Sequence, residues 1–182
     1  PLPWLTYVVW GGRDELHNYH TYYAPSACAY GFVGWQGGAT GEAPCADNED
    51  YYIFGLPILA PADGGVVEAQ NDRPDMIPGE MDPSKPEGNH VTLEVAEGEY
   101  VLMGHMKQGS VRVEVGDQVA VGQQIGEVGN SGNTTEAHLH IHLQDQIPYG
   151  PQAESMPMDY YDLLIDGAPF DRAMPMGSEF VA

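Results

Sequence analysis

The chain has 182 residues, which is enough for one sizeable hydrophobic core and few for two. Its 27 acidic and six basic residues give a formal net charge of −21, which argues against nucleic acid as a partner because phosphate binding needs a basic surface. No apolar run approaches the roughly 20 residues of a membrane-spanning helix.

The order of residues up to 88 predicts a few short strands separated by loops. Residues 4–10 form an apolar, aromatic run, and residues 34–50 are rich in Gly and acidic side chains, as in an exposed hairpin or loop. Residues 51–69 predict two short strands around a Pro-Ala-Asp-Gly-Gly turn. Residues 70–88 are dense in Pro and charge, which indicates a long surface loop.

Strand patterns are clearer from residue 90 onward. Apolar and polar residues alternate in 90–95 and in 138–143, 100–106 reads as a buried strand, and 111–128 reads as short strands broken by glycines. The one helical candidate is a short piece at 158–164. We therefore expect an all-β protein of antiparallel sheet layers, open or barrel-like, with long loops. It would form a single domain over 1–182 with its core at about 50–145.

Two features bear on the compartment. The sequence begins at Pro1 rather than Met, so we expect that a leader or anchor has been removed and that the protein is exported. Cys28 and Cys45 flank a Gly-rich stretch, and in an exported protein such a pair predicts a disulfide. The alternative is two unpaired, buried cysteines.

The strongest chemical signal is the segment Ala-His-Leu-His-Ile-His-Leu at 137–143. Because side chains alternate between the faces of a strand, His138, His140 and His142 project from one face, while the intervening Leu and Ile residues enter the core. Imidazoles at this spacing on a rigid strand can share a metal ion. The alternative is a ladder of solvated or core-packed histidines.

Two further histidines lie in suggestive settings. His105 follows an apolar run and is expected at the end of a buried strand, as a hydrogen-bonded core residue or as an acid/base group. His20 follows Asn18-Tyr19 and is either a metal ligand or a partly exposed structural residue.

Several segments together resemble lysostaphin/LytM-type zinc metallopeptidases. Gly-Asn-Ser-Gly at 129–132 followed by His-Leu-His at 138–140 is similar to that family's signature. Pro-Ile-Leu-Ala-Pro-Ala-Asp-Gly-Gly-Val-Val at 57–67 resembles its hairpin, and Gly-Asn-His-Val-Thr-Leu at 88–93 resembles its next strand. Gly-Ser-Val-Arg-Val-Glu-Val-Gly-Asp-Gln-Val at 109–119 resembles a further segment, so that the likeness covers about 50–145.

The resemblance implies an open antiparallel β fold with the active site in a groove. It implies one zinc ion, held by a His and an Asp of a first motif and by the second His of His-x-His, with a zinc-bound water as nucleophile. Carried over, His140 is a predicted metal ligand, and His138 and His105 are the predicted catalytic pair.

The first motif is where this chain departs from the family pattern. Gly31 stands where the Asp is expected, and Ala27 stands four residues before it, so neither can bind a metal. His20 remains from that region as a predicted ligand, and His142, where the family often has Glu, is a predicted replacement. An acidic residue before the hairpin (Asp47, Glu49 or Asp50) is the alternative replacement.

Three functions follow from these observations. The first is a zinc metalloendopeptidase in the bacterial periplasm, cell envelope or exterior that cleaves peptidoglycan cross-links or similar peptides. The second is a non-catalytic domain of the same type that binds cell-wall material or regulates another hydrolase, which the loss of the Asp favours. The third is a histidine-rich domain that binds copper or zinc without hydrolysis. Because the His-x-His motif persists and is extended, the first is favoured.

Overall fold

A computed structural model describes residues 6–12, 18, 20 and 24–182. Nearly all of its regular structure is antiparallel β-sheet, as predicted, with two single-turn 3₁₀ helices, η2 at Ala24–Ser26 and η3 at Asn48–Asp50. The strands are β1 Thr6–Trp10, β2 Tyr30–Gly34, β3 Pro57–Leu59, β4 Gly64–Gln70, β5 Asn89–Ala96, β6 Glu99–Met106, β7 Gln118–Val119, β8 Gln124–Glu127, β9 Leu139–Gln144, β10 Ser155–Met156, β11 Tyr160–Ile165, β12 Ala168–Ala173 and β13 Phe180–Val181.

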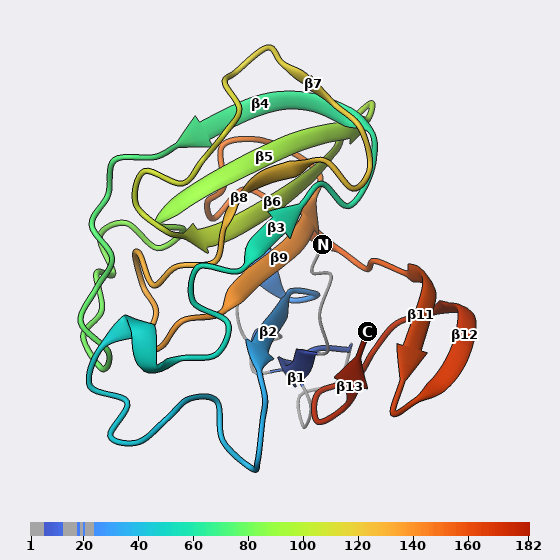
Figure 1. Ribbon diagram of the computed structural model, residues 1–182. Helices are drawn as coiled ribbons and strands as arrows, with labels where there is room; N and C mark the ends of the chain where they lie inside the picture. Colours follow the sequence, from blue (N-terminus) through green and yellow to red (C-terminus); the bar gives the residue numbers. More distant parts are fainter. Residues whose placement is uncertain (1–5, 13–17, 19, 21–23) are drawn as a thin grey trace.

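One long, open sheet organises the described part of the chain (Figure 1). Its strands lie in the order β12-β11-β13-β1-β2-β9-β6-β5-β4-β7, with β10 paired to β9. β12 and β7 are the edge strands, each paired on one side. A second sheet contains β3 and β8. The predicted long loop between β4 and β5 is confirmed, because residues 71–88 form no strand.

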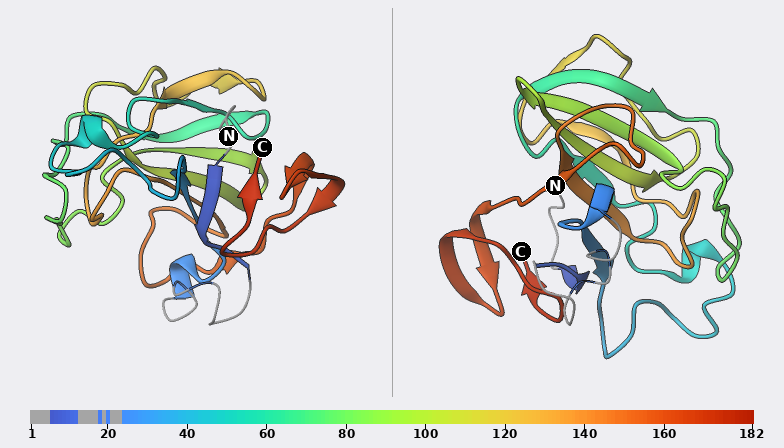
Figure 2. Two further views of the ribbon diagram at one scale, coloured as in Figure 1. Left: turned by 60° about the horizontal axis from the view of Figure 1, so that its bottom comes forward. Right: turned by 180° about the vertical axis from the view of Figure 1, so that it is seen from behind.

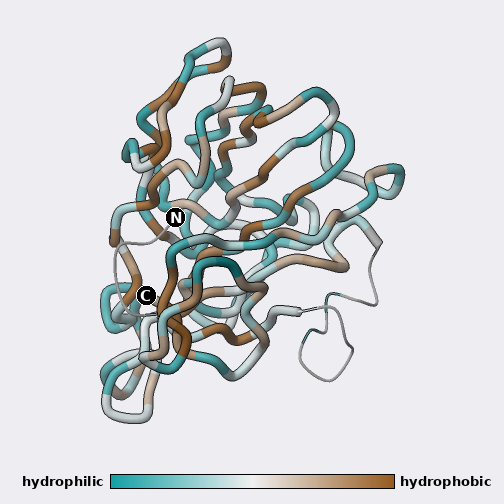
Figure 3. Tube along the Cα trace, turned by 90° about the vertical axis from the view of Figure 1, so that its right-hand side faces the viewer, coloured by the Kyte–Doolittle hydropathy of each residue, from teal (hydrophilic) through white to brown (hydrophobic). Residues whose placement is uncertain are grey.

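The core lies between the two sheets. Ile58 of β3 and Ile125 of β8 are fully buried and belong to the same apolar cluster as Leu93 and Met103 of the long sheet. Apolar and polar segments alternate along the strands of this region (Figure 3), as expected for sheets with one face in the core. Burying each such side chain contributes about 1.5–3 kcal/mol.

The C-terminal segment corrects the prediction of a helix at 158–164, because it forms strand β11. β11 pairs with β12 along its length and with β13 at Ile165. The Tyr160 ring packs edge-on against Tyr30 and Phe32 of β2, at centroid distances of 5.2 and 6.0 Å. These tertiary contacts override the local preference. Figure 2 shows the β11–β12 hairpin projecting at one end of the long sheet.

The predicted disulfide is wrong, since no bond joins Cys28 to Cys45. Cys45 lies in an exposed loop with a left-handed backbone (φ 57°), and its thiol donates to the carbonyl of Glu42 at 3.4 Å. The backbone N–H of Cys28 is instead tied to the hydroxyl of Ser155 near β9. Among the residues described, no helix has the length and apolar character needed to cross a membrane.

Candidate metal centre

Strands β6 and β9 place the predicted histidines side by side in the middle of the long sheet. In the antiparallel register, His140 lies opposite Gly104 and His142 lies opposite Leu102. His138 directly precedes β9, and His105 lies near the end of β6. A Cβ at Gly104 would lie 3.0 Å from the carbonyl oxygen of Glu87, so the glycine allows the Glu87 backbone to approach β6 closely.

His105 is held in an unusual backbone conformation. Its φ is +58°, in the left-handed region that side chains rarely adopt. Its N–H donates to the carbonyl of Glu87 at 2.9 Å, and its own carbonyl accepts from Gly129 at 3.0 Å. The Gly-Asn-Ser-Gly turn is therefore hydrogen-bonded to the end of β6, and its Ser131 carbonyl orients the His105 ring.

The three histidines His105, His138 and His140 form the one group of potential metal-ligating side chains found among the described residues. One nitrogen from each lies within 4.8 Å of the others. Ring centroids of His105 are 4.6 Å from His138 and 5.6 Å from His140. The ring centroid of His20, predicted as a ligand, lies 5.2 Å from that of His140. Residues far apart in the sequence thus meet at one place.

Hydrogen bonds determine which ring nitrogen of His105 and His138 carries the proton. A carbonyl oxygen only accepts, so the Nδ1 of His105, 2.8 Å from the Ser131 carbonyl, is protonated. The Nδ1 of His138, 3.0 Å from the Glu136 carbonyl, is protonated for the same reason. Both Nε2 atoms therefore hold lone pairs.

Asn18 does the same for His20. Its side-chain nitrogen donates to the carbonyls of Gly12, Ala27 and Ala29 at 3.0–3.2 Å, which fixes the orientation of the amide. Its oxygen therefore faces His20 and accepts from the ring Nδ1 at 2.9 Å and from the backbone N–H at 3.1 Å. In the neutral ring of His20 the proton is therefore on Nδ1 and the lone pair is on Nε2.

Burial keeps all of these imidazoles neutral. Burial, and after it the neighbouring His138, lower the pKa of His20 and of His105 from 6.5 to about 3. Burial also lowers the pKa of His138 and, more strongly, that of His140, to which the close His142 adds. A cluster of neutral imidazoles is a donor set that suits Zn²⁺ and similar ions.

No carboxylate joins this group in the part of the chain that the structure describes. Position 31 faces it, but is glycine. Asp50, one of the acidic candidates, accepts from the backbone N–H groups of Ala46 and Asp47 and so caps η3. Asp47 and Glu49 belong to the same turn and lie outside the group.

His142, the third predicted ligand, lies behind His140 and is fully buried. Its Nδ1 is 2.9 Å from the Nε2 of His140, and its Nε2 is 2.8 Å from the side-chain oxygen of Gln144. Both of its nitrogens are therefore engaged, and burial lowers its pKa to about 4.

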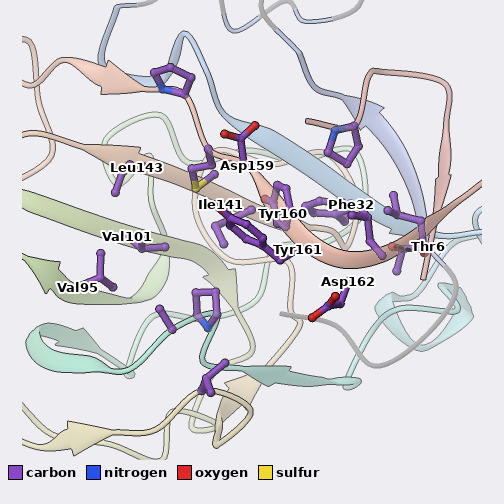
Figure 4. Close-up of a pocket in the computed structure, with 18 of the residues that line it drawn as sticks. Thr6, Phe32, Val95, Val101, Ile141, Leu143, Asp159, Tyr160, Tyr161 and Asp162 are labelled. Atoms are coloured by element: carbon purple, nitrogen blue, oxygen red, sulfur yellow. Dashed lines mark hydrogen bonds between the residues drawn. The ribbon is translucent and has the colours of Figure 1, made fainter. Parts of the chain in front are cut away.

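A groove of about 480 Å³ gives access to the cluster. It is lined by His20, Ser26, Pro83, Pro86, Glu87, Leu102, His105, Asn133, His140, His142 and Tyr149. A larger hollow of about 620 Å³ lies on the opposite face of β9, against Ile141 and Leu143 (Figure 4). Apolar side chains dominate it and it contains no histidine, so the smaller groove is the candidate site.

The residues that orient the histidines were missed in the sequence. Asn18, the carbonyl of Ser131 and Gln144 each hold one imidazole nitrogen. The signal for Gln144 was present, because it continues the same strand face two residues after His142. Asn18 had no such periodicity, and its role depends on contacts with residues 12, 27 and 29 that form only in the folded chain.

Comparison with known proteins places the histidine strand inside a recognised family. Residues 50–151, more than half of the chain, match the model described as Peptidase family M23. The cell division protein DipM of Caulobacter vibrioides is 31% identical over 90 residues, which are 50% of this chain and 13% of DipM. The chain therefore spans a small part of that relative.

Two solved structures are similar over most of the chain. A mutant of the catalytic domain of the prophage-encoded M23 protein EnpA from Enterococcus faecalis is 24% identical, with a TM-score of 0.48. That alignment covers 85% of this chain and 88% of the other. The antimicrobial peptidase lysostaphin from Staphylococcus simulans is 21% identical with a TM-score of 0.49, over 82% of this chain and 46% of lysostaphin.

Proposed function

The chain belongs to peptidase family M23, and we propose that it is a zinc-dependent endopeptidase that cleaves peptidoglycan cross-links or similar short peptides at the bacterial cell envelope. The observation that carries this proposal is the orientation of the histidines. Hydrogen-bond acceptors hold the Nδ1 protons of His20, His105 and His138, so that the lone pair of each neutral ring is on Nε2. A hydrogen bond that fixes the ring nitrogen not used for the metal is typical of metal-binding histidines.

In the proposed site, His140 and His20 are the zinc ligands, and His138 and His105 carry the proton transfers. When bound, a zinc ion supplies the Lewis acid that polarises a scissile carbonyl. The neutral Nε2 of His138 accepts a proton from the attacking water and returns it to the leaving amine. The neutral Nε2 of His105, whose ring is fixed by Ser131, is a second acceptor for the protons of that water. The groove orients the peptide beside these groups.

A second candidate function is supported by Gly31. Without a carboxylate in the group, metal affinity is weaker than in a site with one, because affinity depends on ligand number and charge. A domain that binds cell-wall material or regulates another hydrolase would tolerate that loss. Binding of copper or zinc without hydrolysis is the third candidate, supported by the all-imidazole donor set.

The test begins with metal content, measured by mass spectrometry on protein purified without chelator. About one zinc per chain, together with cleavage of cross-linked muropeptides that is lost in His140→Ala, is the expected result. His90→Ala is the matched control, because the ring of His90 bonds the Gly88 carbonyl outside the group. Absence of metal after zinc addition would select the binding domain, and copper without cleavage would select metal capture.

A further inference from the structure

Three polar side chains follow one another along the histidine face of β9. The Nε2 of His140 is 2.9 Å from the Nδ1 of His142, and the Nε2 of His142 is 2.8 Å from the Oε1 of Gln144. His142 and Gln144 are fully buried, while His140 is half-buried at the groove. The row therefore connects the metal group to a polar side chain deep inside the protein.

The direction of these hydrogen bonds follows from the orientation of the Gln144 amide, whose oxygen faces His142. The Oε1 of Gln144 only accepts, so the Nε2 of His142 donates to it and carries the proton. The Nδ1 of neutral His142 is then an acceptor, and the Nε2 of His140 must donate to it. The proton of neutral His140 is thereby placed on Nε2, and its Nδ1 is left with the lone pair.

We propose that His142 and Gln144 are positioning residues that hold His140 in the tautomer whose Nδ1 can bind a metal. The inference rests on the metal-binding part of the proposed function, and gives the third histidine of the motif a role other than that of ligand. It also explains why positions 142 and 144 of the strand are polar although both are buried. Burying polar side chains there costs more free energy than burying apolar ones unless their hydrogen bonds are satisfied.

The opposite orientation of the Gln144 amide would reverse the row. Its nitrogen would donate to the Nε2 of His142, whose Nδ1 would donate to His140, and the Nδ1 of His140 would then carry a proton. In the observed orientation the Gln144 nitrogen is buried and makes no hydrogen bond within the described structure. No second contact of that nitrogen therefore opposes the reversal, and the choice between the two states lies with this one amide.

The first experiment needs no substitution. Long-range ¹H–¹⁵N NMR spectra of the metal-free protein at pH 7.5 report which nitrogen of each imidazole is protonated. We expect His140 and His142 both with the proton on Nε2. A proton on the Nδ1 of His140 would overturn the proposal, whatever the protein does to peptides.

The second experiment compares two variants at the buried end. Gln144→Glu keeps an acceptor for His142, whereas Gln144→Met of similar length removes it. We expect Gln144→Met to weaken zinc binding about 10–100-fold, as measured by competition with a chromogenic chelator, and Gln144→Glu to restore most of that affinity. Thr92→Val is the control, since its buried hydroxyl bonds Glu68 outside the row. Equal affinities for Gln144→Met and Thr92→Val would contradict the proposal.

These outcomes separate the inference from the proposed function. Correct tautomers and a Gln144 effect on zinc affinity, without any peptide cleavage, would leave the positioning role intact and remove the peptidase assignment. Peptide cleavage by a protein whose His140 carries its proton on Nδ1 would support the peptidase assignment and contradict the positioning role.

Discussion

Gly31 of β2 and His140 of β9 are direct partners across the two strands. A Cβ built on Gly31 would lie 3.8 Å from a ring carbon of His138 and 3.8 Å from a ring carbon of Trp10, at ordinary van der Waals distance. The position that carries no side chain therefore faces the histidine group, with room for one.

Gly31→Asp should for this reason add a carboxylate ligand. We expect zinc affinity to rise about tenfold or more, because a charged oxygen joins a neutral imidazole set in a half-buried site. Chelator competition measures the affinity. Gly31→Asn, which has the same shape without the charge, is the control, and equal affinities for the two variants would place the metal away from position 31.

His138→Ala and His140→Ala should separate proton transfer from metal binding. We expect His138→Ala to keep bound zinc and to lose about 10²–10⁴-fold in kcat, the usual range for an acid/base group. His140→Ala should lose the metal. Metal analysis and cleavage rates on the same preparations check both statements, and loss of zinc from His138→Ala would make His138 a ligand.

Acid should destabilise the metal-free protein below pH 6.5. The folded pKa of His105 is about 3 and that of His142 about 4, both lowered by burial, while both titrate near 6.5 when unfolded. Below 6.5 the unfolded state binds more protons, so each contributes a loss of about 2 kcal/mol by pH 5. Urea denaturation between pH 7.5 and 4.5 measures this. In His142→Phe the slope should be shallower, and an unchanged slope would show that His142 does not contribute.

Asn18→Ala should destabilise the fold more than substitution of a polar loop residue usually does. Two buried carbonyls, one part-buried carbonyl and the ring of His20 lose their partner, and an unsatisfied buried group costs about 1–3 kcal/mol. We expect a fall of about 3 kcal/mol in the free energy of unfolding. Asn133→Ala, at an exposed position of the groove, should change it by less than about 0.5 kcal/mol.

Much of the central sheet could be predicted because its signals are local. The alternation at 90–95 and 138–143 and the apolar run at 100–106 correspond to β5, β9 and β6. The same alternation predicted that the histidines share one face, and the contact of His140 with His142 follows from it. Turn-rich composition likewise predicted the long loop before β5.

What could not be predicted depends on chain crossings. Strand β11 has no alternation of its own and is specified by its pairing with β12 and by the packing of Tyr160 on β2. The two cysteines gave a plausible spacing, but the backbone N–H of Cys28 bonds the hydroxyl of Ser155, whereas the thiol of Cys45 bonds the carbonyl of Glu42. In the sequence, only the resemblance to the family indicated that Gly31 lies near the site. That Gly31 pairs with His140 became clear only from the order and register of the strands.

The alternation of β9 also constrains how this protein can evolve. Odd-numbered positions of the strand fill the core, and even-numbered positions carry the imidazoles and Gln144. A point substitution alters one of the two roles at one place, but an inserted or deleted codon between Leu139 and Gln144 would exchange the two faces for the rest of the strand. The gene segment encoding β9 should therefore accumulate substitutions while tolerating no change in length.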